Sequence, residues 1–336
     1  MTGKERTDAM LEGEVCDFVP RTPILMQYAA EYIGSDYGAF ASDHRVLVEA
    51  NLRCAEDFGM DQVSAISDPY REAAGFGGQI EFVRDGVPRC TPPMAERRDF
   101  SLLKDPDPEQ SDRMRDRLDA VRLFKSKCAG VYSILGWIEG PAAEAADLRG
   151  TSNLMMDFYD DEVFAAELMD RCLKAAVDFA RVQVEAGADM IGVGDAVASQ
   201  ISPDLYERLV QPREKRLVEA IHGFGARVKL HICGEITHLL PGIADLHIDV
   251  LDVDHMVDMK AVRDAVGGRT VLAGNIDPAQ GVARGSTQAI RDHVRRTYEQ
   301  VGNPYFVNAG CEIPAGTPEA NLRALCEPLE YVKRMT

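Results

Sequence analysis

The sequence contains no apolar run that approaches the roughly 18 residues of a membrane-spanning helix. Its first twenty residues are charged throughout, with Lys4, Glu5 and Arg6 close to the start. A secretory signal needs an apolar segment in that place. These two absences exclude a membrane span and a signal peptide, so we expect a cytoplasmic protein.

Basic side chains are in deficit. The chain has 37 Lys and Arg against 55 Asp and Glu, which gives a formal net charge of −18 at pH 7. A nucleic-acid partner demands a basic surface to match its phosphates, so this class of function is excluded. The eight cysteines are scattered through the chain and are typical of reduced thiols, with a few available as metal ligands.

The 336 residues alternate short apolar runs with longer segments of helical period, which indicates parallel βα units. A chain of this length and apolar content favours one domain over residues 1–336. Eight units favour a closed (βα)8 barrel of the TIM type, and an open doubly wound sheet is the alternative. The predicted strands cover residues 23–28, 62–67, 130–137, 189–193, 227–232, 249–253, 269–274 and 305–309.

Three additions to a minimal barrel are predicted. Residues 75–92 contain Asp85-Gly86 between short alternating runs, which predicts a β-hairpin excursion. Residues 104–125 are polar at first and then helical, so we expect a solvated helix beside the barrel mouth. A helical extension is expected at the N-terminus.

The motif KLHICGE carries the strongest chemical signal, because a strand ends there in His231 and Cys233. Side chains two apart on a strand point to the same face, so both can reach one ion. A second strand ends at FVNAGCE, which brings Cys311 to the same end of the barrel. One imidazole and two thiolates suit a tetrahedral Zn2+ with an open fourth position. The alternative is that both cysteines are buried apolar residues and His231 is a hydrogen-bonded core histidine.

Acidic side chains also follow predicted strands. Asp68, Asp195 and Asp254 each come directly after a strand, and Glu312 follows Cys311. Each acid alone is compatible with a helix N-cap. All of them at one face favour a role in the site, where they could orient the metal ligands, bind the metal or bind the substrate. His255 is the one further histidine that the pattern places at the mouth.

The chain resembles the uroporphyrinogen decarboxylase superfamily over essentially its whole length. The resemblance is carried by TPILMQYAAEY, SDPYREAAGFGGQIEF, GADMIGVGDAVASQISPDLYERLVQP, HICGEITHLLPGIADLHIDVLDVD, LAGNIDP and AGCEIPAGTPEAN. It implies a distorted (βα)8 barrel, as the strand pattern does. Decarboxylases carry M-R-Q-A-G-R-Y near the N-terminus, where two arginines bind the substrate's propionates. Gln27 and Glu31 replace both arginines here, which argues against decarboxylation and leaves it a minor alternative.

The corrinoid methyltransferase branch of the superfamily has an H-x-C zinc motif with a distant cysteine. His231, Cys233 and Cys311 match it, so the resemblance implies a zinc-dependent methyltransferase that uses cobalamin held by a separate corrinoid-binding protein. Glu312 departs from the G-C-G of the coenzyme M enzymes, so their thiol acceptor does not carry over.

Two directions of methyl transfer remain open. The favoured direction runs from methylcobalamin to a thiol-type acceptor. The alternative is O-demethylation of a methoxylated aromatic donor to cob(I)alamin, and a non-enzymatic zinc or corrinoid carrier is a further alternative. We assign catalytic roles to Asp68, Asp195 and Glu312. The predicted substrate-binding residues are Met26, Tyr28, Tyr70, Trp137 and His255.

Overall fold

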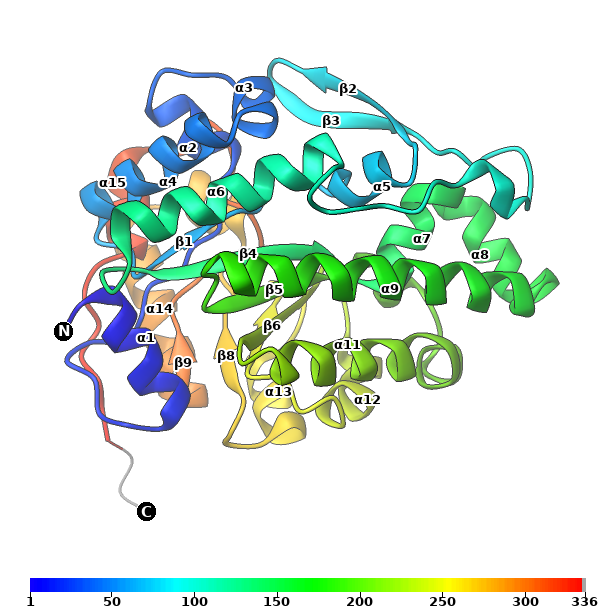
Figure 1. The fold of residues 1–336 in the computed structure, drawn as a ribbon. Helices are drawn as coiled ribbons and strands as arrows, with labels where there is room; N and C mark the ends of the chain where they lie inside the picture. The colour runs from blue at the N-terminus through cyan, green and yellow to red at the C-terminus, as the bar shows by residue number, and fades with distance from the viewer. Residues whose placement is uncertain (334–336) are drawn as a thin grey trace.

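The computed structural model describes residues 1–333, in which strands and helices alternate along the chain (Figure 1). The strands are β1 Gln62–Ser64, β2 Gln79–Val83, β3 Gly86–Thr91, β4 Ser133–Glu139, β5 Met190–Gly194, β6 Arg227–Ile232, β7 Val250–Val253, β8 Val271–Ala273 and β9 Tyr305–Phe306. The longer helices are α1 Gly3–Glu12, α4 His44–Phe58, α6 Asp112–Cys128, α7 Pro141–Arg149, α8 Thr151–Asp160, α9 Glu162–Ala186, α11 Gln211–Gly223, α13 Met259–Val266 and α14 Thr287–Val301.

Shorter helical segments complete the described elements. They are α2 Gln27–Tyr32, α3 Tyr37–Ser42, α5 Arg71–Gly75, α10 Pro203–Leu205, α12 Leu240–Ala244 and α15 Glu319–Leu325, with single turns at Phe100–Leu102, Ala196–Gln200, Tyr206–Val210, Thr237–Leu239 and Pro278–Ala283.

Seven parallel strands form one curled sheet in the order β1-β4-β5-β6-β7-β8-β9. This order follows the chain, as in a barrel, and excludes the doubly wound sheet, in which the strand order reverses. Strands such as β4 and β5 are buried along their whole length, as expected when helices cover the outside of a sheet. The prediction of an α/β barrel is confirmed.

The sheet is closed by a single bridge where an eighth strand was predicted. Arg21 forms a parallel bridge with Val307, and its carbonyl accepts a hydrogen bond from the amide of Asp61, so residue 21 joins both edges of the sheet. The prediction of a strand over residues 23–28 is wrong. Pro23 has no N–H to extend the ladder, and helix α2 begins at Gln27.

A buried ion-pair cluster fixes this closure. The Asp61 carboxylate accepts hydrogen bonds from the backbone N–H of Arg21 (2.7 Å) and from its Nε (3.0 Å). Arg6 of helix α1 donates to the other oxygen of the same carboxylate. Asp61 is 1% exposed, so these charge-assisted bonds form away from water. The N-terminal helical extension is thereby tied to the point where the barrel closes.

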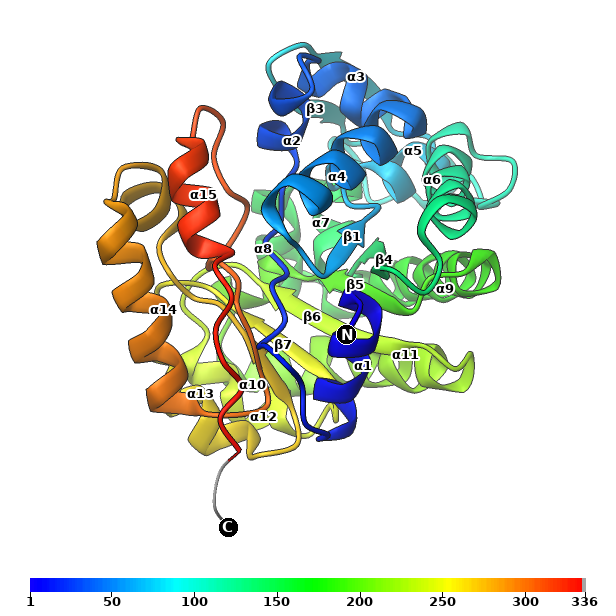
Figure 2. The same cartoon turned by 90° about the vertical axis from the view of Figure 1, so that its left-hand side faces the viewer.

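Helices cover the outside of the sheet, and the β2–β3 hairpin projects beside α3 (Figure 1). Figure 2 shows α2, α3 and α4 gathered on the side of the sheet opposite α11 and α13. The hairpin turns between Val83 and Gly86, as predicted. Helix α6 is less solvated than predicted, because it packs on α4 and α9 and buries Leu118 and Phe124.

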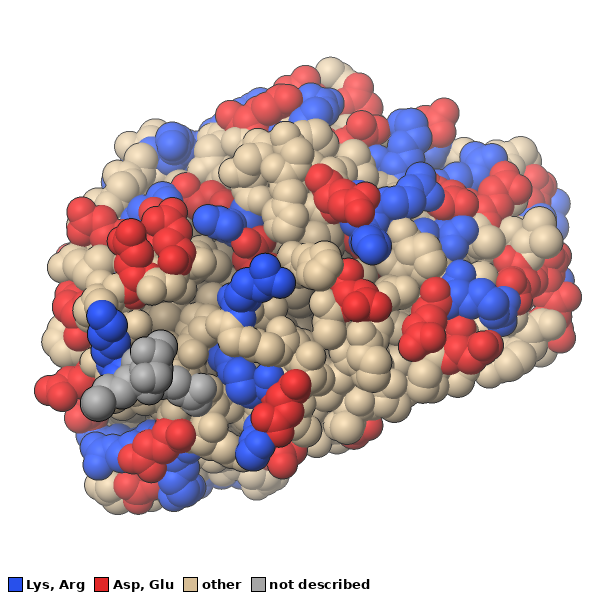
Figure 3. Space-filling model, turned by 90° about the horizontal axis from the view of Figure 1, so that it is seen from below, with Lys and Arg blue, Asp and Glu red and all other residues tan. Residues whose placement is uncertain are grey.

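Among residues 1–333, no helix combines the length and apolar character that a membrane crossing needs. Figure 3 shows the face of the molecule that lies at the bottom of Figure 1. Acidic and basic side chains are interspersed there with neutral surface, so the net negative charge does not gather on this face.

Candidate metal centre

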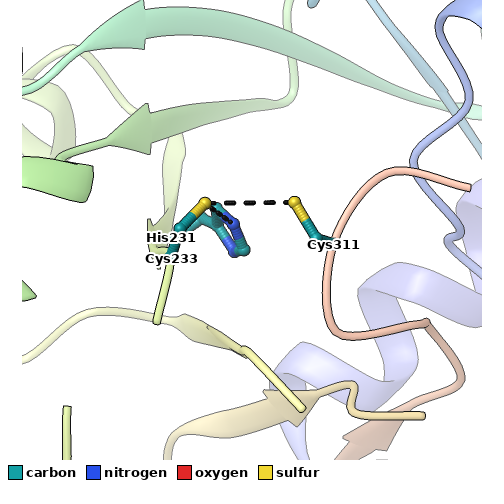
Figure 4. A group of neighbouring side chains, drawn as sticks. All are labelled: His231, Cys233 and Cys311. Carbon is teal, nitrogen blue, oxygen red and sulfur yellow. Dashed lines mark hydrogen bonds between the residues drawn. The ribbon is translucent and has the colours of Figure 1, made fainter. Parts of the chain in front are cut away.

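Three side chains converge at the carboxyl end of the barrel strands (Figure 4). His231 Nε2 lies 2.9 Å from Cys233 Sγ, and Cys233 Sγ lies 3.9 Å from Cys311 Sγ. His231 is in β6 and Cys233 follows that strand, whereas Cys311 comes from the loop after β9 and points across to them. The potential ligand atoms all lie within 4.8 Å of one another.

The spacing of the two sulfur atoms fits a tetrahedral zinc ion, whereas His231 Nε2 and Cys233 Sγ lie closer together than the roughly 3.6 Å of two ligands of one such ion. Two sulfurs that each lie about 2.3 Å from such an ion are about 3.8 Å apart. The measured sulfur–sulfur distance of 3.9 Å matches that spacing and is too long for a disulfide bond. One nitrogen and two sulfur donors are also the ligand types that zinc prefers.

The backbone at the end of β6 turns sharply at Gly234 and directs Cys233 toward the cavity. Gly234 has φ +97°, a conformation that an L side chain rarely adopts. Its N–H donates to the Asp254 carboxylate at 2.8 Å, and the other oxygen of Asp254 lies 2.6 Å from His255 Nδ1. Asp254 therefore holds the loop that carries Cys233.

A buried carboxylate, Asp252, supports His231 from behind. His231 Nδ1 lies 3.2 Å from the Asp252 carbonyl oxygen and 3.8 Å from its carboxylate. Asp252 also pairs with Lys229 Nζ at 2.9 Å and accepts a hydrogen bond from Asn308 at 2.8 Å. A partner on Nδ1 leaves Nε2 free to bind a metal and fixes the orientation of the ring. Opposite charges inside the apolar runs VKLHI and VLDV were a signal of this pair in the sequence.

Electrostatics in the site favour a shared negative charge on sulfur. The hydrogen bond from Cys233, together with the nearby His231, lowers the pKa of Cys311 to about 4. Burial opposes the charged imidazole, yet the Cys311 thiolate and the Asp252 carboxylate raise the pKa of His231 to about 9. Cys311 is thus readily deprotonated beside His231, as a thiolate metal ligand must be.

A cavity of about 160 Å³ opens beside the three ligands. Its walls are mainly apolar, and Trp137 forms the largest of them. The indole lies over Gly192, where a Cβ atom would overlap the ring. The lining consists of Ile24, Met26, Ile66, Asp68, Pro69, Trp137, Glu139, Gly194, Ala196, His231, Cys233, Cys311 and Glu312.

Two of the predicted acids reach this cavity. Asp68 accepts hydrogen bonds from Ser67 Oγ at 2.6 Å and from the amide of Tyr70 at 3.0 Å, and it pairs with Arg113. Burial opposes its charge, but Arg113 and other neighbours lower the pKa of Asp68. Glu312 accepts a hydrogen bond from the amide of Gln27 at 2.9 Å, and burial raises its pKa to about 7.

Four other predicted site residues lie outside the lining of this cavity. Asp195 accepts hydrogen bonds from the amides of Ala142 and Ala143, so it caps helix α7. Tyr28 is buried against Tyr32 and Phe58, Tyr70 precedes helix α5, and His255 lines a separate cavity beside α14. The structure thus places Met26 and Trp137 beside the candidate ligands, together with Asp68 and Glu312.

Glu139 lines the cavity and was not anticipated from the sequence. It ends strand β4, where its carboxylate accepts hydrogen bonds from Arg71 at 2.7 Å and from the Trp137 indole at 3.2 Å. Its signal in the sequence was a charge at the end of the apolar run SILGWIE.

Comparisons with known proteins agree with the fold. The uroporphyrinogen decarboxylase (URO-D) family matches residues 2–331 of the chain. The chain belongs to the uroporphyrinogen decarboxylase family. Membership of this family of enzymes confirms the prediction that the chain is an enzyme.

Relatives within the uroporphyrinogen decarboxylase family include two kinds of enzyme at similar identity. A uroporphyrinogen decarboxylase of Crocosphaera subtropica is 25% identical over 355 residues, covering 100% of this chain and 99% of the relative. The methylcobamide:CoM methyltransferase MtaA of Methanosarcina barkeri is 27% identical over 333 residues and covers 96% of each. Overall identity therefore does not separate the two activities.

A solved structure described as a methyltransferase from Methanosarcina mazei matches with a TM-score of 0.88 and 25% identity, covering 97% of both chains. A B12-independent methionine synthase from Shewanella matches with a TM-score of 0.58 and 15% identity, covering 92% of this chain and 94% of that one, which shows the fold alone. The methyltransferase likeness within the uroporphyrinogen decarboxylase family is as predicted.

The two positions where the resemblance expects the arginines of a decarboxylase carry an amide and an acid in this chain. Gln27 and Glu31 stand there, and the Gln27 amide group lies 3.4 Å from the Glu31 carboxylate. Glu31 also accepts a hydrogen bond from the amide of Gly316 at 3.0 Å, which ties helix α2 to the loop after Cys311. An acid in this place repels a polyanionic substrate.

Proposed function

We propose that the chain is a zinc-dependent methyltransferase that moves a methyl group between a corrinoid, held by a separate protein, and a small substrate. The observation that carries the proposal is the convergence of His231, Cys233 and Cys311 at the wall of a cavity. The open cavity beside the ligands favours a catalytic site over a closed structural zinc site or a carrier function.

A bound Zn2+ supplies a Lewis acid that lowers the pKa of a substrate thiol and thereby favours the nucleophilic thiolate. Cys233 and Cys311 would hold the ion as thiolates, and His231 would bind it through Nε2. Asp252 keeps the imidazole in the required tautomer through Nδ1. The apolar walls, with Trp137 the largest, keep water away from the reacting groups.

The cavity selects a small acceptor without an anionic tail. No Lys or Arg side chain lines it within the described residues. The nearest guanidinium groups, those of Arg71 and Arg113, are already paired with Glu139 and Asp68. A sulfonate such as that of coenzyme M needs a free cation, so we expect a neutral thiol to be a better acceptor.

O-demethylation is the second candidate, and one observation favours it. The Trp137 indole and the side chains of Ile24, Ile66 and Met26 provide the flat apolar wall that an aryl methyl ether needs. In this direction the methyl group passes from the ether oxygen to cob(I)alamin. A zinc ion held by His231, Cys233 and Cys311 would supply the positive charge that favours departure of this oxygen.

The test is a reaction of the zinc-loaded protein with methylcobalamin and a series of thiols, followed by the loss of the alkyl-cobalt absorbance. A neutral alkanethiol should react faster than coenzyme M. If no thiol reacts and a methoxybenzene instead methylates cob(I)alamin, the second candidate replaces the first. If neither reaction occurs, the chain is not a methyltransferase of this kind.

A further inference from the structure

Glu139 and His231 lie in the same row of the sheet. Glu139 of β4 pairs in register with Gly194 of β5, and Gly194 pairs with His231 of β6. Register partners on parallel strands point to the same face, so both side chains project toward the cavity. Gly194 places no side chain between them, and a Cβ there would lie 3.1 Å from Glu139 Oε2.

Glu139 belongs to a buried group with more carboxyls than cations. Glu72 of helix α5 and Glu144 and Asp147 of helix α7 surround the same region, and Arg71 lies 2.7 Å from Glu139 and 3.4 Å from Glu72. Both oxygens of Glu144, and one oxygen each of Glu72 and Asp147, have no hydrogen-bond partner. Buried carboxylates without partners are costly, and burial accordingly raises the pKa of Glu144 and Asp147 well above the ordinary value.

The surroundings set the proton affinity of Glu139. Burial is the largest influence and raises its pKa to about 8, although Arg71 acts in the opposite direction. Other titratable groups that line the same cavity are Asp68 after β1, which pairs with Arg113 of α6, and His231 and Glu312 across the cavity. Asp68 and Arg113 pair with each other, so they change the net charge near Glu139 little.

We propose that Glu139 exchanges the proton that methyl transfer in this cavity requires. The inference rests on the proposed function. When a thiol is methylated, its S–H bond breaks and the Glu139 carboxylate takes the proton. The S–CH3 bond forms as the Co–CH3 bond breaks, and the electron pair of that bond stays on cobalt as cob(I)alamin. For an ether, the electron pair of cob(I)alamin forms the Co–CH3 bond as the C–O bond breaks, and the leaving oxygen keeps the C–O electron pair and takes its proton from the Glu139 carboxyl.

The first experiment measures the pH dependence of methyl transfer from methylcobalamin to a neutral thiol, using zinc-loaded protein. The wild-type rate should rise with pH through about 8, where Glu139 becomes a base. In Glu139→Gln this rise of the rate with pH should be absent, and the reaction should be slower by on the order of 10²–10⁴-fold. In Glu72→Gln the rate should still rise with pH, but at lower pH, because the negative charge of Glu72 no longer raises the pKa of Glu139.

A second measurement separates a proton-exchanging role from a structural one. Infrared difference spectra of the zinc-loaded protein, taken on either side of pH 8, should show a carboxylic acid band that Glu139→Gln removes. Zinc content should stay at the wild-type level, and the exposed Glu167→Gln should match the wild type throughout. If Glu139→Gln keeps the wild-type rate and the wild-type rise of the rate with pH, the proposal is overturned. An inactive wild type overturns the proposed function itself.

Discussion

Cys233 Sγ and Cys311 Sγ lie 3.9 Å apart although 78 positions separate the two residues in the chain. The barrel makes this approach, because β6 and β9 both release the chain at the same end of the sheet. Neither sulfur belongs to a disulfide. The pair is thus available to bind a soft or borderline cation together with His231.

Loss of either sulfur should remove zinc. We expect about one zinc per chain in the wild type and much less in Cys233→Ser or Cys311→Ser, because a hydroxyl is a poor substitute for a thiolate. Metal analysis of the purified proteins measures this. Cys90→Ser is the matched control, since Cys90 lies in the hairpin strand β3, and it should retain the metal. Equal zinc in all four proteins would contradict the assigned ligands.

Asp252→Asn should weaken zinc binding without removing a ligand. The change leaves Lys229 without its charged partner and weakens the support of His231 Nδ1. The backbone carbonyl that lies 3.2 Å from Nδ1 is unchanged, so metal affinity should fall by about 10-fold, the low end of the range for such partners. Competition with a chelator gives the affinity, and Asp264→Asn on the exposed face of α13 should leave it unchanged. A zinc affinity equal to that of the wild type would contradict the role of Asp252 in supporting the zinc ligand His231.

Asp61→Asn should destabilise the fold at the point where the barrel closes. The substitution leaves the buried guanidinium groups of Arg6 and Arg21 without their shared carboxylate. Breaking a buried pair of this kind costs about 3–5 kcal/mol. Denaturant unfolding measures the loss, and Asp178→Asn, in an exposed pair with Lys174, should unfold at nearly the wild-type denaturant concentration. A similar loss of stability in both variants would contradict the role of Asp61 in holding the barrel closed.

No coproporphyrinogen should form from uroporphyrinogen. Gln27 and Glu31 occupy the places where propionate-binding arginines are expected, and Glu31 adds a negative charge. Product analysis after incubation with uroporphyrinogen tests this. Turnover comparable to that of a genuine decarboxylase, measured in parallel as a positive control, would overturn the choice of branch.

The sequence predicted most of the barrel because buried parallel strands are continuous apolar runs. Residues 227–232 correspond to β6 without any shift, and the hairpin turn at Asp85-Gly86 lies between β2 and β3. The prediction of a first strand over residues 23–28 failed for a local reason. Its apolar residues do lie in the core, but Pro23 cannot extend a ladder, so residue 21 makes the closing bridge.

The site was predictable only where its residues share a strand. His231 lies in β6 and Cys233 follows two positions later, so the extended backbone brings them together. Cys311 was placed at the same end of the barrel by the strand before it, and the resemblance to a known family supported this placement. Glu139 and Asp252 were not anticipated, because an acid within an apolar strand reveals its partners only when neighbouring strands are placed beside it.

We propose that a zinc ion held by His231, Cys233 and Cys311 supports methyl transfer, and one measurement tests this proposal most directly. Zinc-loaded protein is mixed with methylcobalamin and a neutral thiol, and the alkyl-cobalt absorbance is followed beside the Cys311→Ser variant. We predict that the absorbance is lost with the wild type, with one thioether formed per methyl group, and persists with the variant. Equal rates in the two proteins, or no methyl transfer in either direction, would contradict the account.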